Sequence, residues 1–89
     1  MRKNNSEKSV EIFYGTSSEV ADRLIEYMIS TGFDIKSLPL QFRARSTIVT
    51  PKKVEIEIMG GVTITVIMKK NKVSFIVEET SRKGAIRVN

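Results

Sequence analysis

Lysine side chains gather in two short segments that are typical of exposed turns. Lys52 and Lys53 follow a proline, and Lys69, Lys70 and Lys72 flank an asparagine. Ammonium groups bind phosphate oxygens, and lysines in turns without base-reading side chains hold a nucleic-acid backbone without specifying its sequence. The chemistry that these residue types favour is therefore the binding of phosphate groups.

A second group of candidate phosphate ligands lies just before a predicted helix. It consists of three consecutive hydroxyl residues, Thr16, Ser17 and Ser18. The first N–H groups of a helix have no partner within the helix and, together with the helix dipole, they attract anions. Gly15 precedes these residues, but the second glycine and the Gly-Lys-[Ser/Thr] ending of a P-loop do not follow, so the segment is not a P-loop.

The order of the turns predicts that the two groups meet. Successive turns of an antiparallel meander alternate between the two ends of the sheet. The two lysine segments then share one end, and the Gly60–Gly61 turn lies at the other. Because the chain must continue from the helix to Leu38 at the far edge, we expect the helix to start at the lysine end and run away from it. The simpler alternative is that lysine is common in exposed turns, where its charge keeps sheets from pairing edge to edge.

The remaining charged residues favour structural roles. One predicted strand carries Glu55 and Glu57 on its exposed face. The strand beside it carries Arg43 and Arg45, so that opposite charges would form exposed cross-strand ion pairs. The chain contains no cysteine and no histidine, which excludes thiolate and imidazole catalysis, disulfides and zinc sites built from those residues. We therefore expect no enzyme, no metal and no cofactor.

Length and composition describe one small domain. The 89 residues suffice for a single hydrophobic core, the net charge is +5 and the pI is about 9.8. No apolar run is long enough to cross a membrane, and the N-terminal residues lack the apolar stretch of a signal peptide, so we expect a cytoplasmic protein. We divide the chain into a flexible segment (1–8), a domain (9–79) and a basic tail or short edge strand (80–89).

The first half of the chain predicts one strand and one helix. Residues 9–14 are rich in β-branched and aromatic side chains, as strands are. Thr16 and Glu19 have the spacing of a capping box, which starts a helix, and Gly32 suits the left-handed position that ends one. Between these signals, apolar residues recur at helical spacing on one face: Val20, Ala21, Leu24, Ile25, Met28 and Ile29.

The second half predicts four strands. From Leu38 to Glu79, apolar residues alternate with polar ones between turn signals. A slip by one residue would turn every apolar side chain to the wrong face, and this condition restricts the register. The pairs that satisfy it are Arg45 with Glu57, Ile58 with Ile64 across a bulged glycine loop (60–62), and Met68 with Val73.

The outer face of the predicted sheet carries two isoleucines among polar residues. In the expected register, Ile67 and Ile76 are diagonal neighbours beside Thr65. An apolar centre with a polar rim is typical of a symmetric homodimer interface, and so small a domain would gain stability from such an interface. The alternative is that scattered isoleucines on a protein surface need no explanation.

These inferences combine into one predicted fold and two main predicted functions. We expect an α+β two-layer sandwich, with one helix packed on a mainly antiparallel sheet of four or five strands, in the order β-α-β-β-β-β with an optional last strand. The first function is a basic, non-catalytic, homodimeric module that binds nucleic acid through its phosphates or has a regulatory role. The alternative is a protein–protein interaction or assembly domain that works through the outer sheet face and has no nucleic-acid role. A carrier of a small ligand under the helix is a third and weaker alternative.

Overall fold

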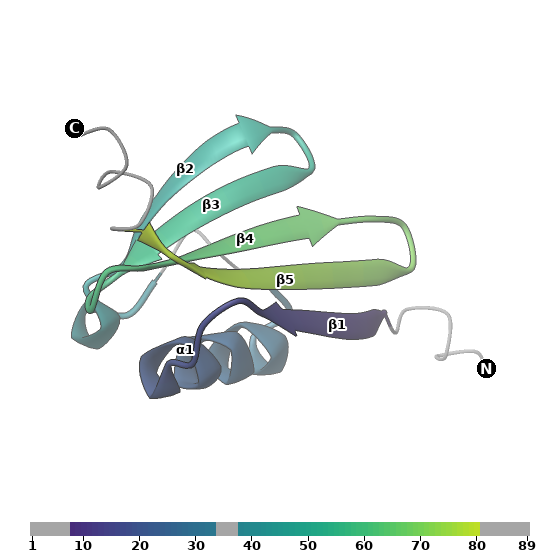
Figure 1. Ribbon diagram of the computed structural model, residues 1–89. Helices are drawn as coiled ribbons and strands as arrows, with labels where there is room; N and C mark the ends of the chain where they lie inside the picture. The colour runs from purple at the N-terminus through teal and green to yellow at the C-terminus, as the bar shows by residue number, and fades with distance from the viewer. Residues whose placement is uncertain (1–7, 34–37, 81–89) are drawn as a thin grey trace.

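A computed structural model of the chain describes residues 8–33 and 38–80 and shows two layers (Figure 1). A single α-helix packs on one face of a five-stranded sheet. In chain order the elements are β1 (Ser9–Tyr14), α1 (Glu19–Ser30), the 3₁₀-helix η2 (Leu40–Phe42), β2 (Arg45–Thr50), β3 (Lys53–Ile58), β4 (Val62–Met68) and β5 (Lys72–Glu79). The predicted α+β sandwich is confirmed. Apart from Lys8 and Thr80, the predicted terminal segments lie outside the described residues.

The sheet is mixed. Its strand order is β1-β5-β4-β3-β2, in which β1 runs parallel to β5 and all other neighbours are antiparallel. One edge of the sheet is therefore β1 and the other is β2 (Figure 1). The β-branched and aromatic residues of 9–14 predicted a strand, but they did not indicate that this strand joins β5 or in which direction.

The N-terminal cap of α1 differs from the prediction, whereas its C-terminal end agrees with it. Ser18, rather than Thr16, is the N-cap, and its hydroxyl accepts a hydrogen bond from the backbone N–H of Ala21 at 3.1 Å. The predicted C-terminal end is confirmed. Gly32 has a left-handed φ of 79°, and the backbone N–H of Phe33 reaches back to a carbonyl of the last turn at 2.6 Å, which satisfies an acceptor that the helix leaves open.

Alternation from Leu38 predicted a strand, but the segment before β2 is not part of one. β2 begins only at Arg45. Pro39 precedes the single turn of η2, and Arg43 after it adopts a left-handed conformation with a φ of 50°. Pro39 itself is extended, and the extended path is interrupted by the turn and by Arg43. The turn buries Phe42 but leaves Leu40 91% exposed, so the apolar residues of this segment do not share one buried strand face.

Two of the three predicted registers are confirmed. The confirmed pairs are Arg45 with Glu57 and Met68 with Val73. The register of β3 and β4 is wrong by two residues, because Ile58 lies opposite Val62 instead of Ile64. The connecting loop is 59–61, in which Gly60 and Gly61 have φ values of 94° and 74°. Glycine adopts this conformation without the steric cost that other residues meet.

The hydrophobic core lies between α1 and the inner face of the sheet. Its buried apolar side chains are Ala21, Leu24, Ile25 and Met28 from α1, Phe42 from η2, Val54, Ile56 and Ile58 from β3, Val62, Ile64 and Val66 from β4, and Val73, Phe75 and Val77 from β5. All six residues of β2 are exposed. The helical layer therefore covers the centre of the sheet and leaves β2 uncovered.

Candidate functional site

The two lysine-rich turns lie at the same end of the sheet. The backbone N–H of Met68 donates to the carbonyl of Lys52 at 2.8 Å, which joins the β2–β3 turn to the end of β4. The N–H of Lys69 donates to the carbonyl of Lys72 at 2.7 Å, which closes the β4–β5 hairpin. We call this end, formed by turns 50–53 and 69–72, the lysine end. The five predicted lysines are Lys52, Lys53, Lys69, Lys70 and Lys72, and the structure brings them together.

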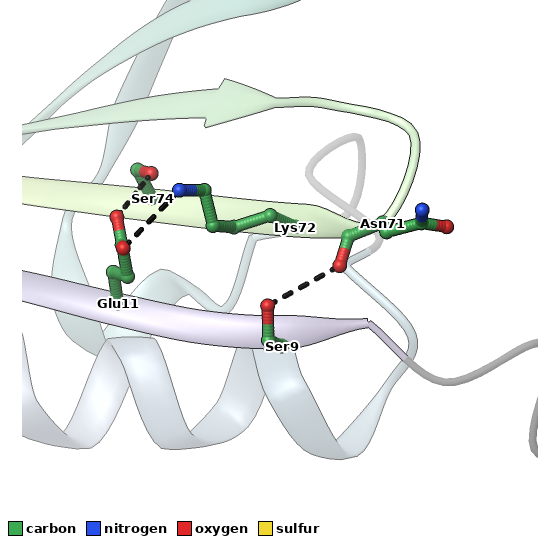
Figure 2. Close-up of polar contacts among 5 residues, drawn as sticks. All are labelled: Ser9, Glu11, Asn71, Lys72 and Ser74. Carbon is green, nitrogen blue, oxygen red and sulfur yellow. Dashed lines mark hydrogen bonds and ion pairs between the residues drawn. The ribbon is translucent and has the colours of Figure 1, made fainter.

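A further lysine, Lys8, also lies at the lysine end. Its Nζ is 3.2 Å from the carbonyl oxygen of Lys69. Ser9 donates to the carbonyl of Asn71 through its backbone N–H at 3.0 Å and through its hydroxyl at 3.3 Å (Figure 2). These contacts follow from the parallel pairing that begins with Ser9 beside Lys72. Sequence reasoning missed Lys8 because that pairing is not visible in the sequence.

One lysine of the lysine end is held in an ion pair. The Nζ of Lys72 lies 3.2 Å from Oε2 of Glu11, and the hydroxyl of Ser74 donates to Oε1 at 3.2 Å (Figure 2). The hydrogen bond from Lys72 is the main cause of the lowered pKa of Glu11; desolvation opposes it, and the bond from Ser74 supports it. Lys72 therefore offers less positive charge to a ligand than its neighbours do.

The other lysines at this end are accessible to a ligand. Those that are exposed are Lys8, Lys52, Lys69 and Lys70, and Lys53 is half-buried. None of them forms an ion pair with an acidic residue in 8–33 or 38–80. Their ammonium groups can therefore contact an anion without first breaking a contact to a described carboxylate.

The predicted hydroxyl ligands do not lie at the lysine end. β1 runs parallel to β5 and carries the chain to the opposite end, where the N–H of Gly15 donates to the carbonyl of Val77 at 2.7 Å. There the Thr16 hydroxyl lies 3.4 Å from a carboxylate oxygen of Glu79, and Ser17 is exposed. The prediction of one site that combines lysines with the helix start is wrong, because it assumed the opposite direction for α1 (Figure 1).

Acidic side chains surround the start of α1. Glu19 and Asp22 occupy its first turn, and Glu78 and Glu79 end the neighbouring strand β5. The hydroxyl of Tyr14 donates to Oδ1 of Asp22 at 2.6 Å, and this bond is the main cause of the raised pKa of Tyr14. Carboxylates at a helix start interact favourably with the helix dipole. The start of α1 is therefore unsuited to phosphate.

The residues predicted to form a dimer patch lie together on the outer face but are only partly exposed. Thr65 lies opposite Ile76 and Ile67 lies opposite Ser74, which confirms the expected arrangement. Both isoleucines are half-buried, and Thr65 is only 9% exposed. Phe13 of β1 lies beside Ile76 and is 54% exposed. Sequence reasoning missed Phe13 because the neighbour of β1 was unknown. Whether the patch binds a second copy stays a prediction.

The predicted pair of Arg45 and Glu57 is present on the same face. Nη2 of Arg45 lies 2.8 Å from Oε1 of Glu57, and the two side chains are 81% and 44% exposed. Exposed ion pairs contribute little to stability. Because Arg45 is paired with Glu57, its charge is less available to a ligand. Within the described residues, no group of three or more acidic side chains is placed to hold a metal ion.

Comparisons of the chain with family models, with curated proteins and with solved structures find no match. No helix in the described part of the chain has the length and apolar character needed to cross a membrane.

Proposed function

We propose that the protein is a small non-catalytic module that binds the phosphate backbone of a nucleic acid through its lysine end. The observation that carries the proposal is the convergence of lysines from three separate segments: the start of β1, the β2–β3 turn and the β4–β5 turn. Ammonium groups that share one surface can contact successive phosphates of a strand and release their counterions.

The distribution of charge over the molecule supports this proposal. The lysine end forms a single ion pair within the described residues, at Lys72, so that most of its positive charge faces solvent. The opposite end carries Glu19, Asp22, Glu78 and Glu79. Arginines also lie at that end, before and at the start of β2, so its charge is mixed, and a polyanion is attracted more strongly to the lysine end before contact.

The proposed contacts are to phosphates and not to bases. Lysine carries a compact point charge on a flexible stem, unlike the planar, forked guanidinium that recognises base edges. Contacts to the backbone position a protein on nucleic acid but carry no sequence information. We therefore propose binding that depends weakly on sequence and strongly on salt.

The test is a titration of the full chain with labelled duplex and single-stranded DNA and RNA at several salt concentrations. For duplex DNA, the logarithm of the binding constant should fall linearly with the logarithm of the salt concentration, with a slope of about −0.9 for each phosphate contacted. The double variant Lys69→Gln, Lys70→Gln should lose roughly two such contacts and bind more weakly. Both side chains are exposed, so the fold should be unchanged.

A matched control removes the same charge elsewhere. Arg23 and Arg43 are exposed and lie outside the lysine end, and the double variant Arg23→Gln, Arg43→Gln should retain most of the affinity and the salt slope. Equal losses in the two double variants would show that net charge alone attracts the nucleic acid. Absence of binding at about 50 mM salt would remove the proposal, because electrostatic binding is strong at low salt.

A protein–protein interaction domain remains the second candidate function. The observation that favours it is the exposed Phe13 beside Ile76 on the outer face, because exposed aromatic residues are enriched at interfaces. This candidate predicts no salt-dependent binding to DNA or RNA. The same titration therefore separates the two functions.

A further inference from the structure

The strand β2 forms an exposed edge of the sheet. It is last in the strand order, so that no strand in the described part of the chain pairs with its outer side. All six residues, Arg45–Thr50, are exposed. Ile48, whose side chain lies on the face that α1 covers elsewhere, is 72% exposed, and Val49 is 47% exposed. Unpaired N–H and C=O groups along such an edge are a template for another strand.

The side chains of β2 suit pairing with an identical strand. In an antiparallel pair centred on Thr47, a two-fold axis relates the two copies, and side chains that face each other lie on the same side of the sheet. The facing pairs are then Thr47 with Thr47, Ser46 with Ile48, and Arg45 with Val49. No like charges are opposed, and the charge of Arg45 is balanced within its own chain by Glu57.

Only the end of β2 near the lysine end is protected against such pairing. The register with β3 is irregular between Ile48 and Thr50, and Pro51 and Lys52 follow. Bulges, proline and lysine are the features that keep natural edge strands from pairing. The first four residues of β2 pair regularly with β3 and have none of these features, so they remain available.

Other surfaces fit a second copy less well. The predicted residues of the outer face are half-buried or, at Thr65, buried. The other edge strand, β1, is half-buried at Glu11 and Ile12. Self-pairing of β1 centred on Glu11 would oppose two carboxylates, which destabilises a strand pair.

We propose that a second copy of this chain pairs with β2 edge to edge and antiparallel, so that the sheet continues from one protomer into the next. The two-fold axis puts both helices on the same face, where the two Ile48 side chains cover part of each other's apolar surface. The contact is one strand wide and smaller than a standard interface, so the dimer is weak and reversible. It requires no nucleic acid and is independent of the function proposed above.

Sedimentation velocity of the full chain without nucleic acid tests the dimer. Between about 10 μM and about 1 mM, the range in which a small interface associates, the weight-average mass should rise from monomer towards dimer. Hydrogen exchange of the β2 amides should slow as the concentration rises, whereas exchange of the β1 amides should not change. A monomer at all concentrations, or protection that rises at β1 instead, would overturn the proposal.

Two proline variants block the edge itself. Successive N–H groups of an antiparallel strand point to alternate sides. One of the variants Ser46→Pro and Thr47→Pro therefore removes a hydrogen bond to β3, and the other removes an N–H group on the free edge. The variant that keeps the circular dichroism spectrum of the folded protein should dimerise at least about 10-fold more weakly than the wild type. Dimerisation of that variant at the wild-type level would contradict the proposal.

The variant Ile48→Lys gives a second test, which does not require the backbone of β2 to accommodate a proline. Its side chain is exposed, so the monomer should fold, while dimerisation should weaken at least about 10-fold. The matched control is Phe13→Lys on the outer face, which should dimerise like the wild type. The reverse result, with loss in the Phe13 variant and none in the Ile48 variant, would assign the interface to the outer face.

Discussion

Gly15 shows how one residue decides the path from β1 into α1. Its N–H donates to the carbonyl of Val77 at 2.7 Å, and a Cβ at this position would lie 3.0 Å from the same oxygen. A side chain here would push the connection away from β5. The glycine that marks the end of a strand in the sequence thus has a tertiary cause, which is the close approach of two segments of backbone.

Ser18 caps α1, and its loss should destabilise the protein. Its hydroxyl accepts from the N–H of Ala21, so Ser18→Ala should lower the free energy of unfolding by about 1 kcal/mol. Thr16→Ala should cost less, because its hydroxyl makes only an exposed contact at 3.4 Å with Glu79. Urea denaturation of both variants measures the difference. A larger loss for Thr16→Ala would instead support the capping box that the sequence predicted.

Glu11 should make the stability depend on pH under acidic conditions. The bond from Lys72 is the main cause of its lowered pKa, so its carboxylate is favoured in the folded state. This contribution is fully present above the ordinary glutamate pKa of about 4.3 and is lost as the pH falls through the lower pKa of the folded state. Glu11→Gln removes it. The difference in unfolding free energy between variant and wild type should therefore be largest at neutral pH and shrink below about pH 4.

Urea unfolding of both proteins at several pH values measures the effect of Glu11. The control is Glu26→Gln, which changes an exposed carboxylate on α1 outside the contacts of Lys72. A difference between Glu11→Gln and the wild type that stays constant from neutral pH to pH 3 would contradict the role assigned to the ion pair, because protonation of the carboxylate should abolish it.

At the scale of elements, side-chain alternation determined which face each residue of β3, β4 and β5 occupies but not the full register. The predicted and observed pairings of β3 with β4 differ by two residues, and such a slip keeps every side chain on its own face. The choice between them was made by the loop 59–61, in which both glycines take positive φ values. No apolar pattern along the strands contains that information.

Val62 distinguishes the two pairings of β3 with β4. In the observed pairing it is buried opposite Ile58, whereas the predicted pairing placed it in the loop. Val62→Ala should therefore cost about 2 kcal/mol, from the lost burial of two methyl groups and the space they leave. The control Val49→Ala, on the exposed edge strand, should change stability by less than about 0.5 kcal/mol. Equal small effects in urea denaturation would favour the predicted pairing.

The connection between α1 and β2 explains why the direction of the helix was predicted wrongly. Alternation in residues 38–44 predicted a strand that would start where the helix ends. This segment instead contains η2 and the left-handed Arg43, and β2 starts only at Arg45. The chain thus has a further connecting segment between α1 and β2, which allows the helix to begin at the end opposite to the lysines (Figure 1).

At the scale of the whole molecule, the lysines and the acidic start of α1 lie at opposite ends of the sheet. Lysines from β1 and from both turns lie at one end, and the acidic start of α1 lies at the other with the end of β5. In an antiparallel β2 pair, the lysine ends of the two protomers point in opposite directions, because each lies beyond the same end of its own β2 strand. A dimer would therefore present two separated phosphate-binding surfaces.

The two proposals together predict that the dimer bridges two nucleic-acid fragments. At protein concentrations that favour the dimer, an immobilised duplex should capture a second, labelled duplex at low salt. Ile48→Lys should still bind the first duplex but lose capture of the second, whereas Lys69→Gln, Lys70→Gln should weaken both. Undiminished capture by the Ile48 variant would show that bridging does not use the β2 edge.

The sequence by itself determined most of the elements, although not η2 or the start of β2, since periodicity and turn residues act over a few neighbouring positions. It predicted β1, the C-terminal end of α1, the β4–β5 hairpin, the convergence of the two lysine turns, and the apolar face of α1 except for Ile29, which is 42% exposed. Only the tertiary structure decided where β1 pairs. That pairing added Lys8 to the lysine end, placed Glu11 beside Lys72 (Figure 2), and moved Thr16, Ser17 and Ser18 to the opposite end. The physical reason is that pairing between strands distant in sequence depends on how the whole core packs, which no local pattern records.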